Sequence, residues 1–326
     1  MENPVLSICV PTYNRLPYLR KQIDYLIGER TPEVEIIVSD NSSSDGTQEY
    51  LKSLDDNLGI RVLINEENKG TEGNMYRCAK IASGEYIYFL GDDDYLITGF
   101  VNYALKLIKQ YNANYYHFNY TAYDDKTRII TKGNGIEEKL NIHNRFLSNR
   151  DIVRLVSKHY GPFLFITSNI YKTELVKQSE NECQLWVETL RLSILSMKSG
   201  TTYIDDESKI LCGVNSAWSD RRGDVWFESF PRMFDNLIEH GFSKAEVEEM
   251  KNHVLACCIF AYYRSGADRM SVKDWNPRIK ELSNTKMKIY YYQFYFKRML
   301  RKLFRTLFRM KDVDIIDNQT SALFRQ

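Results

Sequence analysis

Three consecutive aspartates carry the strongest chemical signal in this chain. Asp92, Asp93 and Asp94 follow Gly91 and the apolar segment 85–90 (EYIYFL). Alternate side chains of an extended segment point the same way, so Asp92 and Asp94 face one ligand and Asp93 points elsewhere. Neighbouring carboxylates repel each other, and a hard divalent cation shared with phosphate oxygens removes that repulsion. We therefore predict Asp94 as the principal metal ligand and Asp92 as a metal or ribose ligand, with a solvated acidic turn as the alternative.

Two further polar clusters follow apolar, β-branched segments. The first is residues 12–15 (TYNR), after the segment 5–11 (VLSICVP), and it offers a hydroxyl, an amide and a guanidinium that suit phosphate or a nucleotide base. The second begins at Asp40, after the segment 35–39 (EIIVS). The Asp40 carboxylate can accept a hydrogen bond from the imide N–H of uracil, or it can cap the turn that follows. Each cluster alone is typical of an ordinary strand–helix turn.

Strands that alternate with helices position these clusters. Buried strands are predicted at residues 5–11, 35–39, 61–65 and 85–90, and helices at 16–27, 44–54 and 74–82. This alternation predicts an α/β, Rossmann-like domain with parallel strands and crossover helices. Ligands of such sheets bind at the carboxyl ends of the strands, and all three polar clusters fall there. Their shared position favours one binding site.

The rest of the chain changes character near residue 215. Before it, helices are predicted at 101–111 and 185–197 and strands at 115–120 and 202–204; after it, helices are predicted at 227–240 and 243–264. We therefore divide the chain into a catalytic domain, residues 1–215, and a helical C-terminal region, residues 216–326.

The composition is that of a globular protein. Of 326 residues, 43% are hydrophobic and 27% are charged, and no run approaches the ~18 apolar residues of a membrane-spanning helix. The start, Met1-Glu2-Asn3-Pro4, lacks the basic region of a secretory signal, so we expect a cytoplasmic protein. The six cysteines show no metal-ligand spacing and are expected to be buried small hydrophobes.

Four segments together resemble the family 2 glycosyltransferases of the GT-A fold. They are VLSICVPTYNR at 5–15, VSDNSSSDGT at 38–47, NKG at 68–70 and SGEYIYFLGDDD at 83–94, in the family's order and spacing. The resemblance implies inverting transfer from a nucleotide-diphosphate sugar, most often UDP-linked, with Mn²⁺ or Mg²⁺. It also implies that Asp40 contacts the base and that Asp92 and Asp94 form the D-x-D site. The remaining donor-site residues that we expect are Pro11, Thr12, Tyr13, Asn14, Arg15 and Asp93.

One segment departs from the commonest family pattern. After residues 68–70, the usual A-R-N-x-G is absent and residues 71–78 read TEGNMYRC. This segment, and Gly91 before the aspartates, is closer to the branch that contains abequosyltransferase-like O-antigen enzymes. That branch includes users of CDP-sugars, so the donor base stays open. Asn74 and Arg77 are the polar residues of this segment that we expect to face the donor.

A general base must take the proton of the acceptor hydroxyl as its oxygen attacks the anomeric carbon. The family often places this base in a Glu-Asp pair about twelve residues before a glycine and a Tyr-Ile-Asp strand. Glu188 has this spacing from Gly200, with Thr189 in place of the second acid. We predict Glu188 as the base, with Glu182 as the second choice and a solvated helix residue as the alternative for Glu188.

Residues 215–224 (NSAWSDRRGD) form a polar segment with Trp218, Arg221 and Arg222. It reads either as a mobile loop over the donor, with the two arginines on the diphosphate, or as a surface connection. The sequence does not decide between these two readings.

The basic C-terminal segment predicts a partner of its own. Residues 286–311 contain nine lysines and arginines and no acid. Leu300, Leu303, Phe304, Leu307 and Phe308 have the spacing of one helix face, opposite Arg301, Lys302, Arg305 and Arg309. We predict a helix on an anionic membrane surface, and hence a peripheral location on the inner face of the cell membrane. The alternatives are packing on the protein's own core and contact within a homo-oligomer; no nucleic-acid-binding module is recognisable.

Two other functions compete with glycosyl transfer. A nucleotidyltransferase of similar fold needs a glycine-rich loop after the first strand, and residues 11–17 contain no glycine. A non-catalytic membrane adaptor would keep the aspartates as relics. Family resemblance also favours a cell-surface glycan or a lipid-linked molecule as the acceptor.

Overall fold

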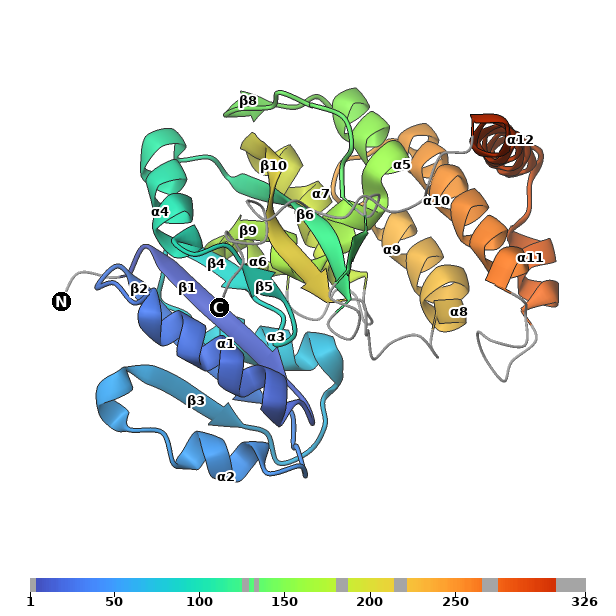
Figure 1. The fold of residues 1–326 in the computed structure, drawn as a ribbon. Coiled ribbons are helices and arrows are strands. Elements are labelled where there is room, and N and C mark those ends of the chain that lie inside the picture. Colours follow the sequence, from blue (N-terminus) through green and yellow to red (C-terminus); the bar gives the residue numbers. More distant parts are fainter. Residues whose placement is uncertain are drawn as a thin grey trace. The chain divides into compact units, whose positions relative to one another are not determined.

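The computed structural model describes residues 4–124, 129–131, 135–179, 187–213, 222–265 and 275–308. It divides into two compact units (Figure 1). The first unit contains the chain up to Leu147 and the described residues from Gly161 to Gly213, and the second contains Ser148–Tyr160 and the described residues from Arg222 onward. The domain boundary that we predicted at residue 215 lies outside the described residues.

One mixed β-sheet organises the first unit. Its strands, within the described ranges, are β1 (Leu6–Thr12), β2 (Val34–Asp40), β3 (Ile60–Ile64), β4 (Tyr86–Phe89), β5 (Tyr95–Leu96), β6 (Tyr115–Asp124), β7 (Ile129–Thr131), β8 (Arg145–Phe146), β9 (Asn169–Lys172) and β10 (Thr201–Gly213). Their order is β3-β2-β1-β4-β9-β6-β10-β5, with β7 on β6 and β8 on β10. Strands β3, β2, β1 and β4 run parallel, whereas β9 is antiparallel to β4 and β6.

The first four strands form where the sequence is apolar and β-branched. Leu6, Ile8, Cys9 and Val10 of β1 are at most 1% exposed, so this strand is covered on both faces, as in other parallel sheets. The four strands predicted from the sequence are confirmed within one residue at each end. The predicted α/β domain with parallel strands is therefore confirmed.

Helices cover both faces of these strands. The helices of the first unit are α1 (Leu16–Gly28), α2 (Thr47–Lys52), α3 (Gly70–Ile81), α4 (Phe100–Tyr111), α6 (Thr173–Gln178) and α7 (Glu188–Ser199). Helices α1, α2 and α4 share one core with Ile8 and Val10 of β1, and Figure 1 shows α1 lying along β1. Helix α3 packs on the opposite face, because its Cys78 contacts Cys9, which points away from Ile8 and Val10. Helix α6 packs on α3 and on α7 and so continues this second layer.

Short polar side chains set the first residues of α3 and α2. We expected α3 to start at Asn74, after the glycines, but it starts at Gly70, whose N–H donates to the Asn68 side chain at 2.9 Å. We expected residues 44–47 to open α2, with Ser44 or Asp45 as the cap; the helix starts at Thr47, whose N–H donates to the Asp45 carboxylate at 3.2 Å. In both cases a short polar side chain just before the helix satisfies a free N–H and sets the first turn.

The carboxyl ends of the central strands lie at one edge of the sheet. Thr12 is paired in register with Asp40 of β2, and Cys9 is paired with Phe89 of β4. The chain leaves β4 only three residues before Asp92. The parallel register therefore brings the loops after β1, β2 and β4 to the same edge, as the sequence predicted.

The second unit is helical, as predicted for the C-terminal region. It contains most of α5 (Asn149–Leu164), and α8 (Arg222–Asp224), a π-helical turn (Val225–Ser229), α9 (Phe230–Asn236), α10 (Lys244–Ser265), α11 (Asn276–Leu282) and α12 (Thr285–Phe308). The buried rings of Phe227, Tyr262 and Trp275 form part of its core. Among the described helices, none combines the length and the apolar character that a membrane crossing requires.

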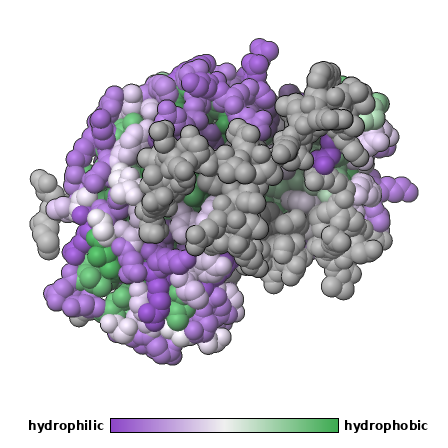
Figure 2. All heavy atoms as spheres, in the orientation of Figure 1, coloured by the Kyte–Doolittle hydropathy of each residue, from purple (hydrophilic) through white to green (hydrophobic). Residues whose placement is uncertain are grey.

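The surface of the first unit is polar on the face drawn in Figure 2. Hydrophilic residues cover most of it, and the hydrophobic residues form small separate spots. Scattered apolar side chains of this kind are normal on a globular domain.

Candidate functional site

Hydrogen bonds join the three polar loops at the carboxyl edge of the sheet. The Thr12 hydroxyl donates to Asp92 Oδ2 at 2.6 Å, which connects the end of β1 to the aspartates after β4. The Asn14 N–H donates to Ser43 Oγ at 2.8 Å, and the Ser44 N–H donates to Asn14 Oδ1 at 2.7 Å, which connects the loops after β1 and β2. The predicted convergence of these loops is confirmed.

Asp40 is the last residue of β2, at the same edge of the sheet. Its side chain is fully buried, and its Oδ2 accepts a hydrogen bond from the Ser43 N–H at 3.0 Å. Its Oδ1 is buried and has no hydrogen-bond partner among the described residues. A buried acceptor without a partner costs about 1–3 kcal/mol, so this oxygen marks a position where a ligand N–H would be stabilised.

The three aspartates have three different environments. Asp93 accepts a hydrogen bond from Arg15 at 2.9 Å, in a partly exposed ion pair. Asp94 is buried, and its carboxylate accepts hydrogen bonds from the Gly213 N–H at 3.1 Å and from the Thr167 hydroxyl. Thr167 also accepts a hydrogen bond from the Gly91 N–H at 2.9 Å. Arg15 thus neutralises Asp93, while Asp94 has only neutral donors around it in these contacts.

The glycine before the aspartates is required by this packing. A Cβ atom at Gly91 would overlap the Asp94 carboxylate and would lie 3.1 Å from the Thr167 hydroxyl. Any side chain at this position would push Asp94 away from its two donors. The position of the Asp94 carboxylate therefore depends on a glycine at residue 91.

Burial makes negative charge unfavourable at Asp92 and Asp94. It raises the pKa of Asp92 to about 7, with the Thr12 hydrogen bond opposing and the Asp93 charge reinforcing the shift. It raises the pKa of Asp94 to about 8, again reinforced by Asp93 and opposed by the Thr167 hydrogen bond. A cation near both carboxylates would remove this penalty, because it favours the ionised form of each.

The donor set suits Mg²⁺ or Mn²⁺ as part of a shared site. Both are hard cations, and proteins often hold Mg²⁺ with one or two carboxylates plus the phosphates of the substrate. Within the described part of the chain, no group of three His, Cys, Asp or Glu side chains lies close enough to hold a metal alone. Asp92 and Asp94 therefore fit the role of protein ligands to an ion whose other ligands are phosphate and water.

Asn74 connects α3 to the strand ends beside the site. It is 2% exposed, its amide N–H donates to Ser39 O at 2.8 Å, and its Oδ1 accepts from Ser39 Oγ at 2.6 Å and from Asn65 at 3.0 Å. These polar atoms hold α3 against the ends of β2 and β3, and the contact of Asn74 with the donor stays a prediction. Arg77, which is exposed on the same helix, stays a prediction.

The sequence did not reveal the asparagine cluster that fixes the β2 and β3 loops. Asn41 Oδ1 accepts hydrogen bonds from the Lys69 N–H at 2.9 Å and from Asn65 at 3.1 Å, and its amide donates to Asn68 at 2.8 Å. The available signal was the recurrence of asparagine directly after strand ends, where its side chain bonds nearby backbone. Asn41, Asn65 and Asn68 are positioning residues for the loop that carries Asp40.

Glu188, the predicted base, is buried in an ion pair. It is 1% exposed, and its carboxylate pairs with the fully buried Arg191 at 2.5 Å and accepts a hydrogen bond from the Tyr76 hydroxyl. Arg191 also donates to Ser179 O at 3.0 Å. The alternative reading of Glu188 as a solvated helix residue is wrong, because its carboxylate is buried against Tyr76 of α3 and Arg191 of its own helix. The base role stays a prediction, and these contacts do not favour it, because a base must reach the acceptor hydroxyl.

Several predicted residues cannot be placed. Glu182, Trp218 and Arg221 lie outside the described residues, and Arg222 is described only as the first residue of α8. Of the remaining predicted donor-site residues, Tyr13 and Asn14 are exposed beside the strand ends, and Pro11 is partly exposed. Their contacts with a ligand stay predictions.

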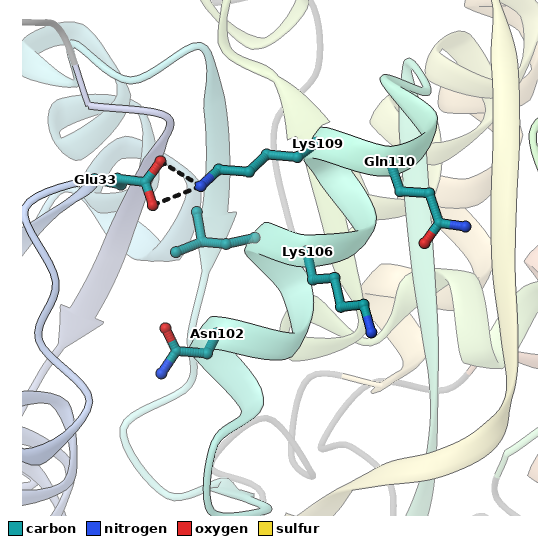
Figure 3. Close-up of a pocket in the computed structure, with 6 residues that line it drawn as sticks. Glu33, Asn102, Lys106, Lys109 and Gln110 are labelled. Atoms are coloured by element: carbon teal, nitrogen blue, oxygen red, sulfur yellow. Dashed lines mark hydrogen bonds and ion pairs between the residues drawn. The ribbon is translucent and has the colours of Figure 1, made fainter.

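A separate depression lies at the other end of the sheet (Figure 3). It has a volume of about 480 Å³, and its lining comes from Glu33, just before β2, and from α4: Asn102, Leu105, Lys106, Lys109 and Gln110. Lys109 pairs with Glu33 across it at 2.7 Å. Glu33 stands at the amino end of β2, away from the aspartates, and the two opposite charges satisfy each other. We assign no function to this depression.

The comparisons with known proteins agree with this geometry. The sequence profile described as glycosyl transferase family 2 matches residues 7–172, about half of the chain. A GalNAc(5)-diNAcBac-PP-undecaprenol beta-1,3-glucosyltransferase of Campylobacter jejuni is 32% identical over 196 residues, which are 56% of this chain and 59% of that protein. Abequosyltransferase RfbV of Salmonella typhimurium is 32% identical over 96 residues, which are 28% of this chain and 29% of that protein. The chain thus matches less than two thirds of the length of either relative.

Solved structures show the same fold. TarS residues 1–349 of S. aureus have a TM-score of 0.61 at 18% identity, over 84% of this chain and 77% of that one. A mannosyltransferase of Pyrobaculum calidifontis, solved with GDP-Man and Mn²⁺, has a TM-score of 0.53 at 14% identity, over 81% of this chain and 76% of that one. At these identities the likeness shows the fold alone. The predicted GT-A fold with a helical C-terminal region is confirmed.

Proposed function

Because the chain belongs to glycosyl transferase family 2, we propose that it moves a sugar from a nucleotide-diphosphate donor to a hydroxyl group of a glycan or lipid-linked acceptor. One observation carries the proposal: Thr12 and the carboxylates of Asp40, Asp92 and Asp94 converge at one sheet edge, and within the described ranges none of these three carboxylates forms a direct ion pair. A nucleoside diphosphate with a divalent ion supplies both of the missing partners, an N–H donor and positive charge.

The donor in this proposal is a UDP-sugar. The unpartnered Asp40 Oδ1 suits the imide N–H of uracil, which is a donor that cytosine lacks at the same ring position. TarS has been solved with UDP and with UDP-GlcNAc, and relatives include the UDP-Glc-using glucosyltransferase WfgD of Escherichia coli. CDP-sugars are the alternative, since abequosyltransferase RfbV is among the relatives.

In this proposal the described residues of the site have different roles. Asp94 and Asp92 would hold Mn²⁺ or Mg²⁺, which when bound offsets the charge of the departing nucleoside diphosphate. Thr167 and Gly213 orient Asp94, and Arg15 keeps Asp93 from adding its full charge to the pair. Inverting transfer also needs an acceptor base; Glu188 and Glu182 are the two candidates from the sequence.

The acceptor and location are proposed from the relatives. The enzyme of Campylobacter jejuni and WfgD are both named for undecaprenol-linked acceptors. We therefore propose a lipid-linked acceptor and a peripheral location on the inner face of the cell membrane. Self-association into a homo-oligomer stays an alternative use of the C-terminal helix, and no nucleic-acid partner is proposed.

A thermal-shift screen tests the proposal directly. We expect UDP with Mn²⁺ to raise the melting temperature more than CDP, GDP or dTDP with Mn²⁺, because only a bound ligand stabilises the folded state. Incubation with UDP-sugars and Mn²⁺, without acceptor, should release UDP slowly, which a non-catalytic adaptor would not do. Stabilisation by none of the four nucleotides would refute the proposal, and a response to nucleoside triphosphates alone would favour a nucleotidyltransferase.

A further inference from the structure

Helix α12 uses one of its faces to pack within the second unit. Met287 is 1% exposed, and the Tyr290 ring is stacked on His253 of α10 with centroids 3.5 Å apart. The ring of the next residue, Tyr291, contacts Phe260 of α10 with centroids 6.0 Å apart. This inner face accounts for part of the aromatic content of the helix.

The opposite face of α12 is also apolar, and it is exposed. At about 100° per residue, five large side chains fall within one arc of about 100°, on the side away from Met287. We call them the outer face of α12: Ile289 (52% exposed), Tyr292 (58%), Phe296 (54%), Met299 (49%) and Leu300 (49%). Contiguous apolar side chains with this exposure are uncommon on soluble proteins unless they contact a partner.

Basic side chains flank the outer face. Lys288 lies along one side of the arc, and Lys286 and Lys297 lie along the other; all three are exposed. The segment 286–311 contains nine lysines and arginines without any aspartate or glutamate. Long lysine stems can lie along an apolar surface while the ammonium group reaches a neighbouring anion. The partner must therefore be apolar in the middle and anionic at the sides.

We propose that the outer face of α12 docks on an anionic phospholipid bilayer. The five apolar side chains enter the boundary between headgroups and acyl chains, and the flanking lysines meet headgroup phosphates. A second copy of α12 would bring two basic, acid-free segments together, and the like charges would repel. Nucleic acid matches the charges but offers no apolar surface of this length. The inference is independent of the transfer reaction, because it rests on α12 alone.

Vesicle flotation of the full chain, without any sugar donor, tests this assignment. Vesicles of phosphatidylcholine with about 30% phosphatidylglycerol should bind the protein at least about tenfold more strongly than vesicles of phosphatidylcholine alone. Raising NaCl from about 0.1 to about 0.5 M should lower binding severalfold, because the attraction is screened. Equal binding to both kinds of vesicle, or no binding to either, would overturn the proposal.

A matched pair of variants tests which face is used. The double substitution Tyr292→Ser and Phe296→Ser should weaken binding about tenfold or more, since it removes two rings from the interface. Phe146→Ser removes a ring of similar size, 75% exposed on β8 of the first unit, and should leave binding unchanged. If the double variant does not fold, Lys288→Gln with Lys297→Gln should remove most of the preference for phosphatidylglycerol.

If a second copy of the chain covers the outer face of α12, flotation and light scattering should give a different result. Wild-type binding by the double variant would exclude the outer face as the docking surface. A concentration-dependent dimer in light scattering, lost in the double variant and accompanied by no vesicle binding, would assign the face to a second copy and overturn the proposal. A monomer that floats only with the anionic vesicles would support it.

Discussion

The pKa values of carboxylates shift in opposite directions at the two ends of the same sheet. At the carboxyl end, burial raises the pKa of Asp92 to about 7 and of Asp94 to about 8. At the amino end, burial alone would raise the pKa of Glu35, but hydrogen bonds from Ser7, Ser83 and Arg61 lower it below its usual value. The hydrogen bonds to Glu35 thus outweigh the effect of burial on its pKa, whereas the hydrogen bonds to Asp92 and Asp94 do not.

This contrast separates structural carboxylates from functional ones. A carboxylate whose partners are all within the protein contributes to stability, and one left with a raised pKa in a convergent site is a candidate for ligand binding. Glu188 resembles Glu35 in this respect, because Arg191 and Tyr76 occupy its oxygens. Substitutions at the four carboxylates should therefore fall into two classes.

The largest effect is expected for Asp94→Asn. Transfer should fall at least about 10³-fold, or about 4 kcal/mol, because the principal metal ligand is lost. Without metal, however, the variant should be more stable than the wild type at pH 7. The pKa of about 8 in the folded state exceeds the ordinary 3.8, so wild-type stability is lost as the pH rises between these values.

Melting curves with and without Mn²⁺ and UDP check both halves of this prediction. The ligands should stabilise the wild type but not Asp94→Asn, and Asp24→Asn, on the exposed side of α1, should behave as the wild type does. An Asp94→Asn enzyme with near-normal turnover would show that Asp94 is not a metal ligand.

The next largest effect is expected for Glu188→Gln, and it concerns stability. Removing one partner of a buried ion pair costs about 3–5 kcal/mol, because Arg191 keeps an uncompensated charge. Urea unfolding measures this cost directly. The double variant Glu188→Gln, Arg191→Met should recover much of it, since no lone charge stays buried.

The same variant discriminates the base hypothesis. If Glu188 is the acceptor base, transfer should collapse in Glu188→Gln even under conditions where the protein is fully folded, while UDP binding stays normal. If the ion pair is only structural, the specific activity of the folded fraction should be retained. Loss of transfer in the folded variant would show that Glu188 is a functional carboxylate, unlike Glu35.

A smaller effect is expected for Thr167→Val, which removes the hydroxyl between Asp94 and the Gly91 N–H. Loss of a group that orients a metal ligand typically weakens metal binding by 10–100-fold. The Mn²⁺ concentration that half-saturates the thermal shift should rise by this factor, and Thr167→Ser should restore it. An unchanged Mn²⁺ dependence would mean that Thr167 does not position Asp94.

Thr167 also illustrates what the sequence could not predict. The strands and the polar clusters at their ends were predictable, because apolar periodicity and turn chemistry are local properties of the chain. The contacts of Asp94 join it to Thr167 and Gly213, which are far away in sequence. These residues come together only because β9 and β10 join the same sheet as β4. The local sequence pattern does not predict this pairing of distant strands.

The burial of Glu188 and Arg191 was also not predictable from the sequence. Glu188 and Arg191 are three residues apart on a helix, which is also the spacing of an ordinary surface ion pair. The packing of α3 against this helix buries them, and packing depends on distant segments. Similarly, β10 was predicted only for residues 202–204, because the polar residues 205–209 interrupt the apolar pattern. The strand nevertheless runs to Gly213, with register shifts between Asp205 and Ile210.

The smallest effect is expected for Glu35→Gln at the compensated end of the sheet. The variant should lose about 1 kcal/mol at pH 7, since a charge-assisted hydrogen-bond set becomes a neutral one. The folded-state pKa lies below the ordinary 4.5, so this stability is present above pH 4.5 and is lost as the pH falls through the folded-state pKa. Urea midpoints of the two proteins should therefore differ at pH 7 and converge once the pH lies below the folded-state pKa, with Glu67→Gln, a mostly exposed residue, as the control. If the urea midpoints still differ at low pH, the effect of the substitution comes from the packing of the side chain and not from its charge. The contrast in charge between the two ends of the sheet would then be unsupported at Glu35.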